Sequence, residues 1–166
     1  LLPSTPITMK GFCWMRMVLP TGSSSPNRFC AVVLPTSATR VAERTSLVFE
    51  IEADDHSRLP LLQEREMWRI AQEAITNIER HAGASEVRVI WRCNGDSAAL
   101  DITDNGQGFP IGTAGRLDSY GIVGMRERAS SIGATLDITS QPGKGTRVRA
   151  SLIRPIEQTA PAGSSA

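Results

Sequence analysis

The chain has 166 residues, a formal net charge of +1 and 21% charged residues, which is enough for one domain with a hydrophobic core. No basic patch interleaved with aromatic residues runs along it, so a nucleic-acid surface is not indicated. Three cysteines, none in metal-ligand spacing, argue against a disulfide framework and predict a reducing, cytoplasmic compartment. No run approaches the roughly 20 apolar residues of a membrane span, and no signal peptide is evident.

Prolines and a serine run interrupt the first part of the chain. Between residues 1 and 45 no helical or strand period survives these breaks, so we predict an irregular, linker-like segment there. A folded domain is predicted over residues 46–156. Residues 157–166 are small and polar and are predicted to form a disordered tail.

The predicted domain opens with a strand and a long helix. Apolar residues alternate over residues 46–52, which is typical of a half-buried strand. The stretch from Pro60 to Gly83 then predicts a helix, since proline suits the first turn and glycine the position after the end. Glu64 and Glu66 lie early in it, where the helix dipole favours acids.

Two stripes run along this helix. The apolar one, predicted to face the core, consists of Met67, Ile70, Ala71, Ala74, Ile75, Ile78 and Ala82. Beside it, Glu73, Asn77 and His81 are spaced four apart, with Arg80 adjoining, so they share one edge of the helix. A solvated helix face explains this polar edge about as well as a binding site does.

Short turns join the elements that follow. Alternating patterns predict strands over residues 86–93, 98–103, 134–140 and 147–153, and a helix over residues 120–132. The order of strand, helix, two strands, loop, helix and two strands predicts a two-layer α/β sandwich. Its sheet is mixed and mostly antiparallel, and its helices cover one face.

Three glycine-bearing places come next to the polar edge in this arrangement. Asp104 ends a strand and precedes Gly106 and Gly108. Its carboxylate could accept a hydrogen bond from an exocyclic amine while the glycine backbone passes close to a flat ring. Gly121 and Gly124 open the second helix, where free N–H groups bind phosphate.

The third place is the hairpin of residues 141–146, where the hydroxyl of Thr146 could reach Asp104 or a bridging water. Taken alone, the Asp104 segment is explained as well by a strand-ending turn as by a site. A lone pair of glycines before a helix is more often a cap than a phosphate site, and such a hairpin is usually only a hairpin. Their order and spacing around the Glu73–Asn77 helix are hard to explain as turns only.

Residues 47–153 resemble the ATP-binding domain shared by sensor histidine kinases, gyrase, Hsp90 and MutL, the Bergerat fold. The likeness is strongest to sensor kinases that pair with NarL/LuxR-type response regulators. It rests on motifs in the family order: RIAQEAITN and RHA within residues 69–82, DNGQGF at 104–109, GIVGMRERA at 121–129 and PGKGT at 142–146.

This resemblance implies an ATP and Mg²⁺ site and a protein histidine kinase activity. Asn77 would supply an oxygen to Mg²⁺, Glu73 would lie near the metal waters and the γ-phosphate, and Asp104 would accept from the adenine amino group. The residues that it assigns to the nucleotide are Asn77, Arg80, His81, Asp104, Gly106, Gly108, Gly121, Gly124 and Thr146.

The phosphate acceptor is the point of departure from the family. Its dimerisation helix carries a histidine followed by an acid, but here His81 belongs to the helix motif and His56 to a predicted loop. We therefore expect the acceptor on a separate or missing dimerisation domain. A Bergerat ATPase switch of the gyrase–Hsp90–MutL kind and a non-catalytic nucleotide-binding remnant remain alternatives.

Overall fold

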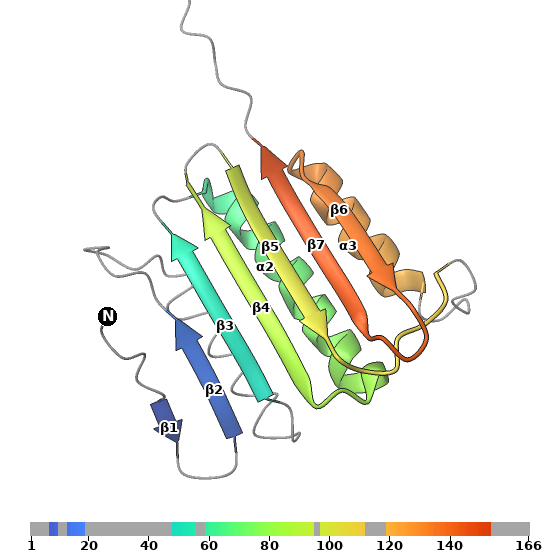
Figure 1. Cartoon of the computed structure of the whole chain (residues 1–166). Coiled ribbons are helices and arrows are strands. Elements are labelled where there is room, and N and C mark those ends of the chain that lie inside the picture. The colour runs from blue at the N-terminus through green and yellow to red at the C-terminus, as the bar shows by residue number, and fades with distance from the viewer. Residues whose placement is uncertain are drawn as a thin grey trace, which may run out of the picture.

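Both helices of the described structure cover one face of a seven-stranded sheet (Figure 1). This computed structural model describes residues 7–9, 13–18, 48–55, 59–94, 97–111 and 119–153. The two-layer arrangement predicted from the sequence is confirmed. In the part of the chain that the structure describes, no helix is long and apolar enough to cross a membrane.

The sheet is mixed and mostly antiparallel, as predicted. Its order is β1-β2-β3-β4-β5-β7-β6. Only the pairs β2–β3 and β3–β4 are parallel, and the other neighbours run antiparallel. The strands are β1 Ile7–Met9, β2 Cys13–Val18, β3 Val48–Asp55, β4 Glu86–Cys93, β5 Ser97–Asp104, β6 Thr135–Ser140 and β7 Thr146–Ile153.

Two strands lie in the segment that we predicted to be irregular. β2 pairs in parallel with β3, in a register that sets Met15 opposite Phe49, and β1 pairs with β2. These strands form because neighbouring strands supply their backbone hydrogen-bond partners. That pairing cannot be recognised from the local sequence pattern. The remainder of residues 1–45, the tail after residue 156 and His56 lie outside the described residues.

The first helical stretch begins and ends where the sequence predicts. α2 (Leu61–Asn77) starts directly after Pro60, and a π-helical turn, η2 (Ile78–Ala82), completes it before Gly83. Gly83 has a φ of 58°, the left-handed conformation that glycine adopts most easily. The π turn was not predicted. Such turns are rare in proteins, and those that occur are often found at functional sites.

The core lies between this helix and the sheet. All seven residues of the predicted apolar stripe on α2 and η2 are buried. They meet inward-facing residues of the central strands, among them Trp91, Leu100 and Ile102, each at most 1% exposed. The second helix, α3 (Ser119–Ser131), adds Met125 to this core. Burial of this apolar surface holds the polar edge of α2 above the sheet.

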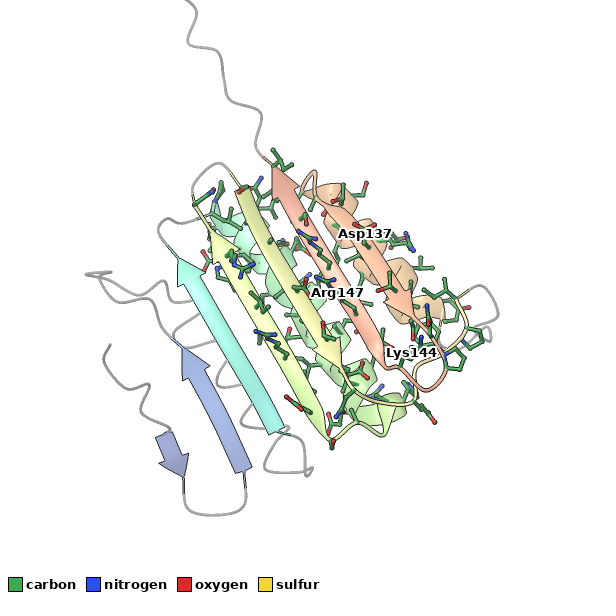
Figure 2. The ribbon with its side chains drawn as sticks, in the orientation of Figure 1. Asp137, Lys144 and Arg147 are labelled. Atoms are coloured by element: carbon green, nitrogen blue, oxygen red, sulfur yellow. The ribbon has the colours of Figure 1, made fainter. Side chains whose placement is uncertain are left out.

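Over β4 to β7, whose side chains the structure describes, the face of the sheet turned away from the helices carries polar side chains (Figure 2). Asp137 of β6 and Arg147 of β7 stand on it. Arg147 forms a forked ion pair with Asp101 of β5, in which Nε lies 3.0 Å from each carboxylate oxygen. Asp101 raises the pKa of Arg147 further above its ordinary value. The site described next lies on the other, helix-covered side.

Candidate functional site

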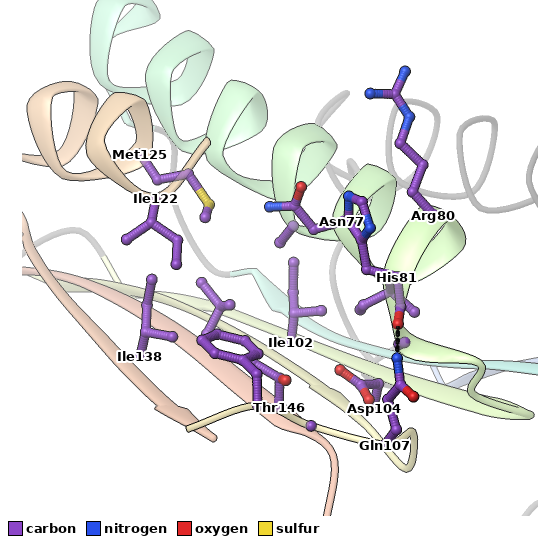
Figure 3. A pocket seen from close by; sticks show the side chains of 16 residues that line it. Asn77, Arg80, His81, Ile102, Asp104, Gln107, Ile122, Met125, Ile138 and Thr146 are labelled. Atoms are coloured by element: carbon purple, nitrogen blue, oxygen red, sulfur yellow. Dashed lines mark hydrogen bonds between the residues drawn. The ribbon is translucent and has the colours of Figure 1, made fainter. Parts of the chain in front are cut away.

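A cavity of about 370 Å³ lies between the end of α2, the start of α3, the end of β5 and the start of β7 (Figure 3). Its lining residues are Ala74, Asn77, Ile78, Arg80, His81, Ala82, Ile102, Asp104, Gln107, Gly108, Phe109, Ile122, Met125, Ile138, Thr146 and Val148. Six of the ten predicted site residues are in this set. The other four, Glu73, Gly106, Gly121 and Gly124, do not line the cavity.

Part of the cavity wall is apolar. Ile102 of β5 faces the cavity from the sheet, and Ile122 and Met125 face it from α3 (Figure 3). Val148 of β7 also lines it. The sequence analysis missed these residues, because apolar periodicity assigns them to the core. A signal was nevertheless present: Ile102 lies two residues before Asp104 on one strand, and side chains two apart share a face. The result is a slot suited to a flat apolar ring.

Asp104 is the buried polar group of this slot, with 3% of its surface exposed. Its Oδ1 accepts a hydrogen bond of 2.7 Å from the N–H of Gly106. Its Oδ2 is buried and has no hydrogen-bond partner among the described residues. Burial raises the pKa of Asp104, although backbone hydrogen bonds from Gly106 and Thr146 oppose the rise. The carboxylate therefore presents a desolvated acceptor to a ligand that carries a donor.

The glycines around Asp104 serve protein packing. A Cβ on Gly106 would lie 2.3 Å from the carbonyl oxygen of Ala82, and one on Gly108 would lie 2.1 Å from that of Gln141. We expected these glycines to admit a ligand ring. The structure corrects this for Gly106, which admits the backbone of η2 and does not line the cavity. Gly108 both lines the cavity and admits the final hairpin.

Gln107 ties this loop to two other segments. Its side-chain amide donates to the carbonyl of His81 at 2.6 Å, and its N–H donates to the carbonyl of Ala82 at 2.8 Å. Its own carbonyl accepts from the N–H of Gly143 at 2.6 Å. No local pattern indicates this role, because all three partners are distant in sequence. Gln107 thereby sets the end of η2, which carries Arg80 and His81, against the loop after Asp104.

Thr146 acts differently from the prediction. Its hydroxyl lies 2.9 Å from the hydroxyl of Ser140. Ser140 also accepts from the N–H of Phe109 at 2.9 Å. It is the backbone N–H of Thr146 that acts on Asp104, where it lowers the carboxyl pKa. Thr146 therefore supports the slot through its main chain, and its hydroxyl closes the hairpin.

Glu73 and Asn77 meet the start of α3. A Cβ on Gly121 would lie 2.5 Å from Oε1 of Glu73 and 3.3 Å from Nδ2 of Asn77. The predicted proximity of these three residues is thus present. Gly124 differs, since nothing lies within 4 Å of its Cβ position. Because α3 starts at Ser119, Gly124 lies beyond the first four residues, whose N–H groups are free of intrahelical bonds.

A chelating metal cluster is absent from the described residues, in which no group of three or more His, Cys, Asp or Glu side chains comes together. Where α2 meets the start of α3, the amide of Asn77 and the carboxylate of Glu73 are oxygen donors suited to a hard cation. A Mg²⁺ ion here would need most of its ligands from phosphate and water, which is how this ion is usually held beside nucleotides.

Residues 63–156 match the model of the histidine kinase-, DNA gyrase B-, and HSP90-like ATPase family. Among curated relatives, the sensor histidine kinase LiaS of Bacillus subtilis is 41% identical over 85 residues, which are 51% of this chain and 23% of that protein. The sensor protein VraS of Staphylococcus aureus is 44% identical over 92 residues, 55% of this chain and 26% of VraS. The chain thus spans about a quarter of their length.

Solved structures share the fold at low identity. The blue-light activated histidine kinase of Erythrobacter litoralis EL346 superimposes with a TM-score of 0.62 at 22% identity, covering 76% of this chain and 42% of that one. The mycobacterial sensor histidine kinase MprB gives a TM-score of 0.55 at 21% identity, covering 75% of this chain and 94% of that one.

Proposed function

Because this chain belongs to the histidine kinase-, DNA gyrase B-, and HSP90-like ATPase family, we propose that it binds Mg-ATP as the catalytic part of a sensor histidine kinase. The observation that carries the proposal is the buried Oδ2 of Asp104 in an apolar slot. An acceptor left unpaired in such a place costs roughly 1–3 kcal/mol. A ligand with a matching donor recovers that energy.

Adenine fits this requirement. Its flat ring would lie between the sheet residues Ile102 and Val148 and the α3 residues Ile122 and Met125, which line the cavity. Its exocyclic amine would donate to Asp104. A base with a carbonyl at that position would instead set two acceptors against each other. The arrangement therefore favours adenine over hypoxanthine or guanine.

The phosphates would extend from the slot toward Asn77, Arg80 and His81, which line the same cavity. Asn77 would give one oxygen to Mg²⁺, and Glu73 would orient the metal-bound waters. The metal neutralises phosphate charge when bound. Arg80 adds a second positive charge on this side. Glycine at position 121 keeps the start of α3 close to this end.

In the proposed reaction an imidazole nitrogen of an acceptor histidine attacks the γ-phosphorus, and the bond to the β–γ bridging oxygen breaks, which releases ADP. Most of the catalysis is positioning and charge stabilisation. We propose that the acceptor lies on a dimerisation domain of a sensor kinase. The NarL/LuxR-type response regulator and the cytoplasmic location remain predictions from the sequence.

The test uses the chain with γ-labelled Mg-ATP, with and without the acceptor domain of a related kinase. We expect acid-labile label on the acceptor domain and none on this chain alone. Asp104→Ala should weaken the binding of Mg-ATP and of adenosine alike. Asn77→Ala should weaken only the magnesium-dependent binding of ATP and leave adenosine binding unchanged. Arg147→Ala, on the opposite face of the sheet, is the matched control.

The alternatives predict other results. Rapid ATP hydrolysis without an acceptor would support an ATPase switch of the gyrase–Hsp90–MutL kind. A non-catalytic remnant would bind the nucleotide, would not hydrolyse it, and would transfer phosphate to none of several acceptor domains tested. Unchanged ATP affinity in both the Asp104 and the Asn77 variants would show that the site itself is assigned wrongly.

A further inference from the structure

An ion pair between a buried glutamate and a partly exposed arginine joins α2 to α3 outside the nucleotide cavity. The side chain of Glu66 on α2 is 8% exposed, and its Oε2 lies 3.5 Å from Nη1 of Arg128 on α3. Two arginines of α2 approach the other oxygen: Nε of Arg65 at 3.1 Å and Nη1 of Arg69 at 3.7 Å. Neither Glu66 nor Arg128 lines the cavity, so the proposed function leaves this pair without a role.

The pair lies on the same seam as the proposed phosphate end of the site. Glu66 precedes Glu73 by seven residues, and Arg128 follows Gly121 by seven. Glu66 faces Arg128, and Glu73 faces Gly121. The two helices therefore run antiparallel along one line of contact. Seven residues are about two helical turns, or about 10 Å along the axis.

The apolar contacts on this seam do not select a register by themselves. Met125 and Ala129 of α3 are buried there and Ile122 packs on the core, but apolar burial is non-directional. A buried carboxylate is different, because sliding α3 away would remove the only one of its three arginine partners that lies on α3 and leave Oε2 without its cation. Burial raises the pKa of Glu66, yet the hydrogen bond from Arg65, the charge of Arg69 and the hydrogen bond from Arg128 together bring it below its ordinary value.

We propose that the Glu66–Arg128 ion pair is a positioning contact, which fixes the register of α3 on α2 and so keeps Gly121 against Glu73 and Asn77. The inference rests on the proposed function in one respect, that Glu73 and Asn77 serve the phosphates and metal. A slip of α3 by one turn would bring Met125 to the place of Gly121. An apolar side chain would then stand against the carboxylate where the structure has room only for hydrogen.

The experiment compares Glu66→Gln, Arg128→Met and Arg128→Lys in the full chain. Arg126→Met is the matched control, because Arg126 is an exposed arginine of the same helix. In the nucleotide-free protein, the NMR signals of the Gly121 amide and the Asn77 side-chain amide report the seam directly. Isothermal titration gives the affinities for Mg-ATP and for adenosine, which lacks phosphates.

We expect Glu66→Gln and Arg128→Met to move both NMR signals and to weaken Mg-ATP roughly tenfold, with adenosine changed less than about twofold. Arg128→Lys should restore part of the affinity, and Arg126→Met should change neither readout. Unmoved signals at Gly121 and Asn77, with only a lower melting temperature, would overturn the inference. If the unaltered chain fails to bind Mg-ATP, the proposed function fails, but the NMR signals still decide the register.

Discussion

The side-chain amide of Gln107 donates a 2.6 Å hydrogen bond to the main-chain carbonyl of His81 (Figure 3). This bond joins the loop after Asp104 to the π-helical turn that carries Arg80 and His81. The two halves of the proposed site, one for the base and one for the phosphates, are therefore held by one residue. Gln107 itself lines the cavity between them.

Removing this donor should weaken nucleotide binding through the phosphate side. Gln107→Met keeps the length of the side chain and deletes the hydrogen bond, whose net contribution is about 0.5–1.5 kcal/mol. We expect a comparable loss in the free energy of Mg-ATP binding, measured by titration, and a smaller loss for adenosine. In a His81→Gly, Arg80→Ala background the added loss should vanish. An equal loss for adenosine and ATP would contradict this account.

Asp104→Asn should stabilise the nucleotide-free protein at neutral pH while it impairs binding. The pKa of Asp104 is raised in the folded state. Its contribution to stability is therefore complete below the ordinary aspartate pKa and is lost as pH rises through the raised value. At neutral pH the buried charge opposes folding, and asparagine removes it. We expect a higher melting temperature than that of the unaltered chain at pH 7.5, and a difference that shrinks as the pH falls toward 4.

Asp104→Asn should stabilise the fold but weaken nucleotide binding. An amide at position 104 can present a donor to the adenine amine, so Mg-ATP should bind more weakly by roughly 1–3 kcal/mol. For the unaltered chain, acidification protonates Asp104 and should weaken binding in the same way. A titration series from pH 8 downward checks this, and an affinity that is independent of pH would count against Asp104 as the acceptor.

Gly143 and Gly145 form a matched pair in the last hairpin. Both have positive φ, 77° and 75°, but a Cβ on Gly143 meets nothing within 4 Å, whereas one on Gly145 would lie 2.0 Å from the carbonyl oxygen of Asp104. Alanine at either position costs roughly 1–2 kcal/mol of left-handed strain. Only Gly145→Ala should also displace the hairpin from Asp104. Denaturant unfolding should show a larger loss for Gly145→Ala, together with weaker ATP binding.

Gly121 and Gly124 form a second pair, on α3. Alanine stabilises a helix interior by about 1 kcal/mol relative to glycine, and Gly124→Ala has open space for its methyl group. Gly121→Ala would place that group 2.5 Å from Oε1 of Glu73, so the carboxylate must move. We expect thermal unfolding to show a gain for Gly124→Ala only. Magnesium-dependent ATP binding should fall in Gly121→Ala, and equal behaviour of the two variants would contradict the packing described.

The sequence could predict what depends on local periodicity. The apolar stripe of α2, its boundaries at Pro60 and Gly83, and the alternating strands follow from side-chain directions that repeat every 3.6 or 2 residues. The polar edge formed by Glu73, Asn77, Arg80 and His81 follows from the same rule, and all of these except Glu73 line the cavity. Asp104 was predicted because a carboxylate at a strand end, next to glycines, can accept from an exocyclic amine, and because the segment resembles a nucleotide-binding motif of the family.

Only the tertiary structure could decide the contacts between distant segments. The strands β1 and β2 depend on β3 for their backbone partners, and Gly106 is required by the carbonyl of Ala82. Gln107 reaches η2 from 26 residues away, and Arg128 reaches Glu66 from 62. The sequence analysis placed Glu66 merely as an acid near a helix start. Its partner Arg128 could be found only from the tertiary structure, because the packing of α2 beside α3 on the sheet depends on the whole core.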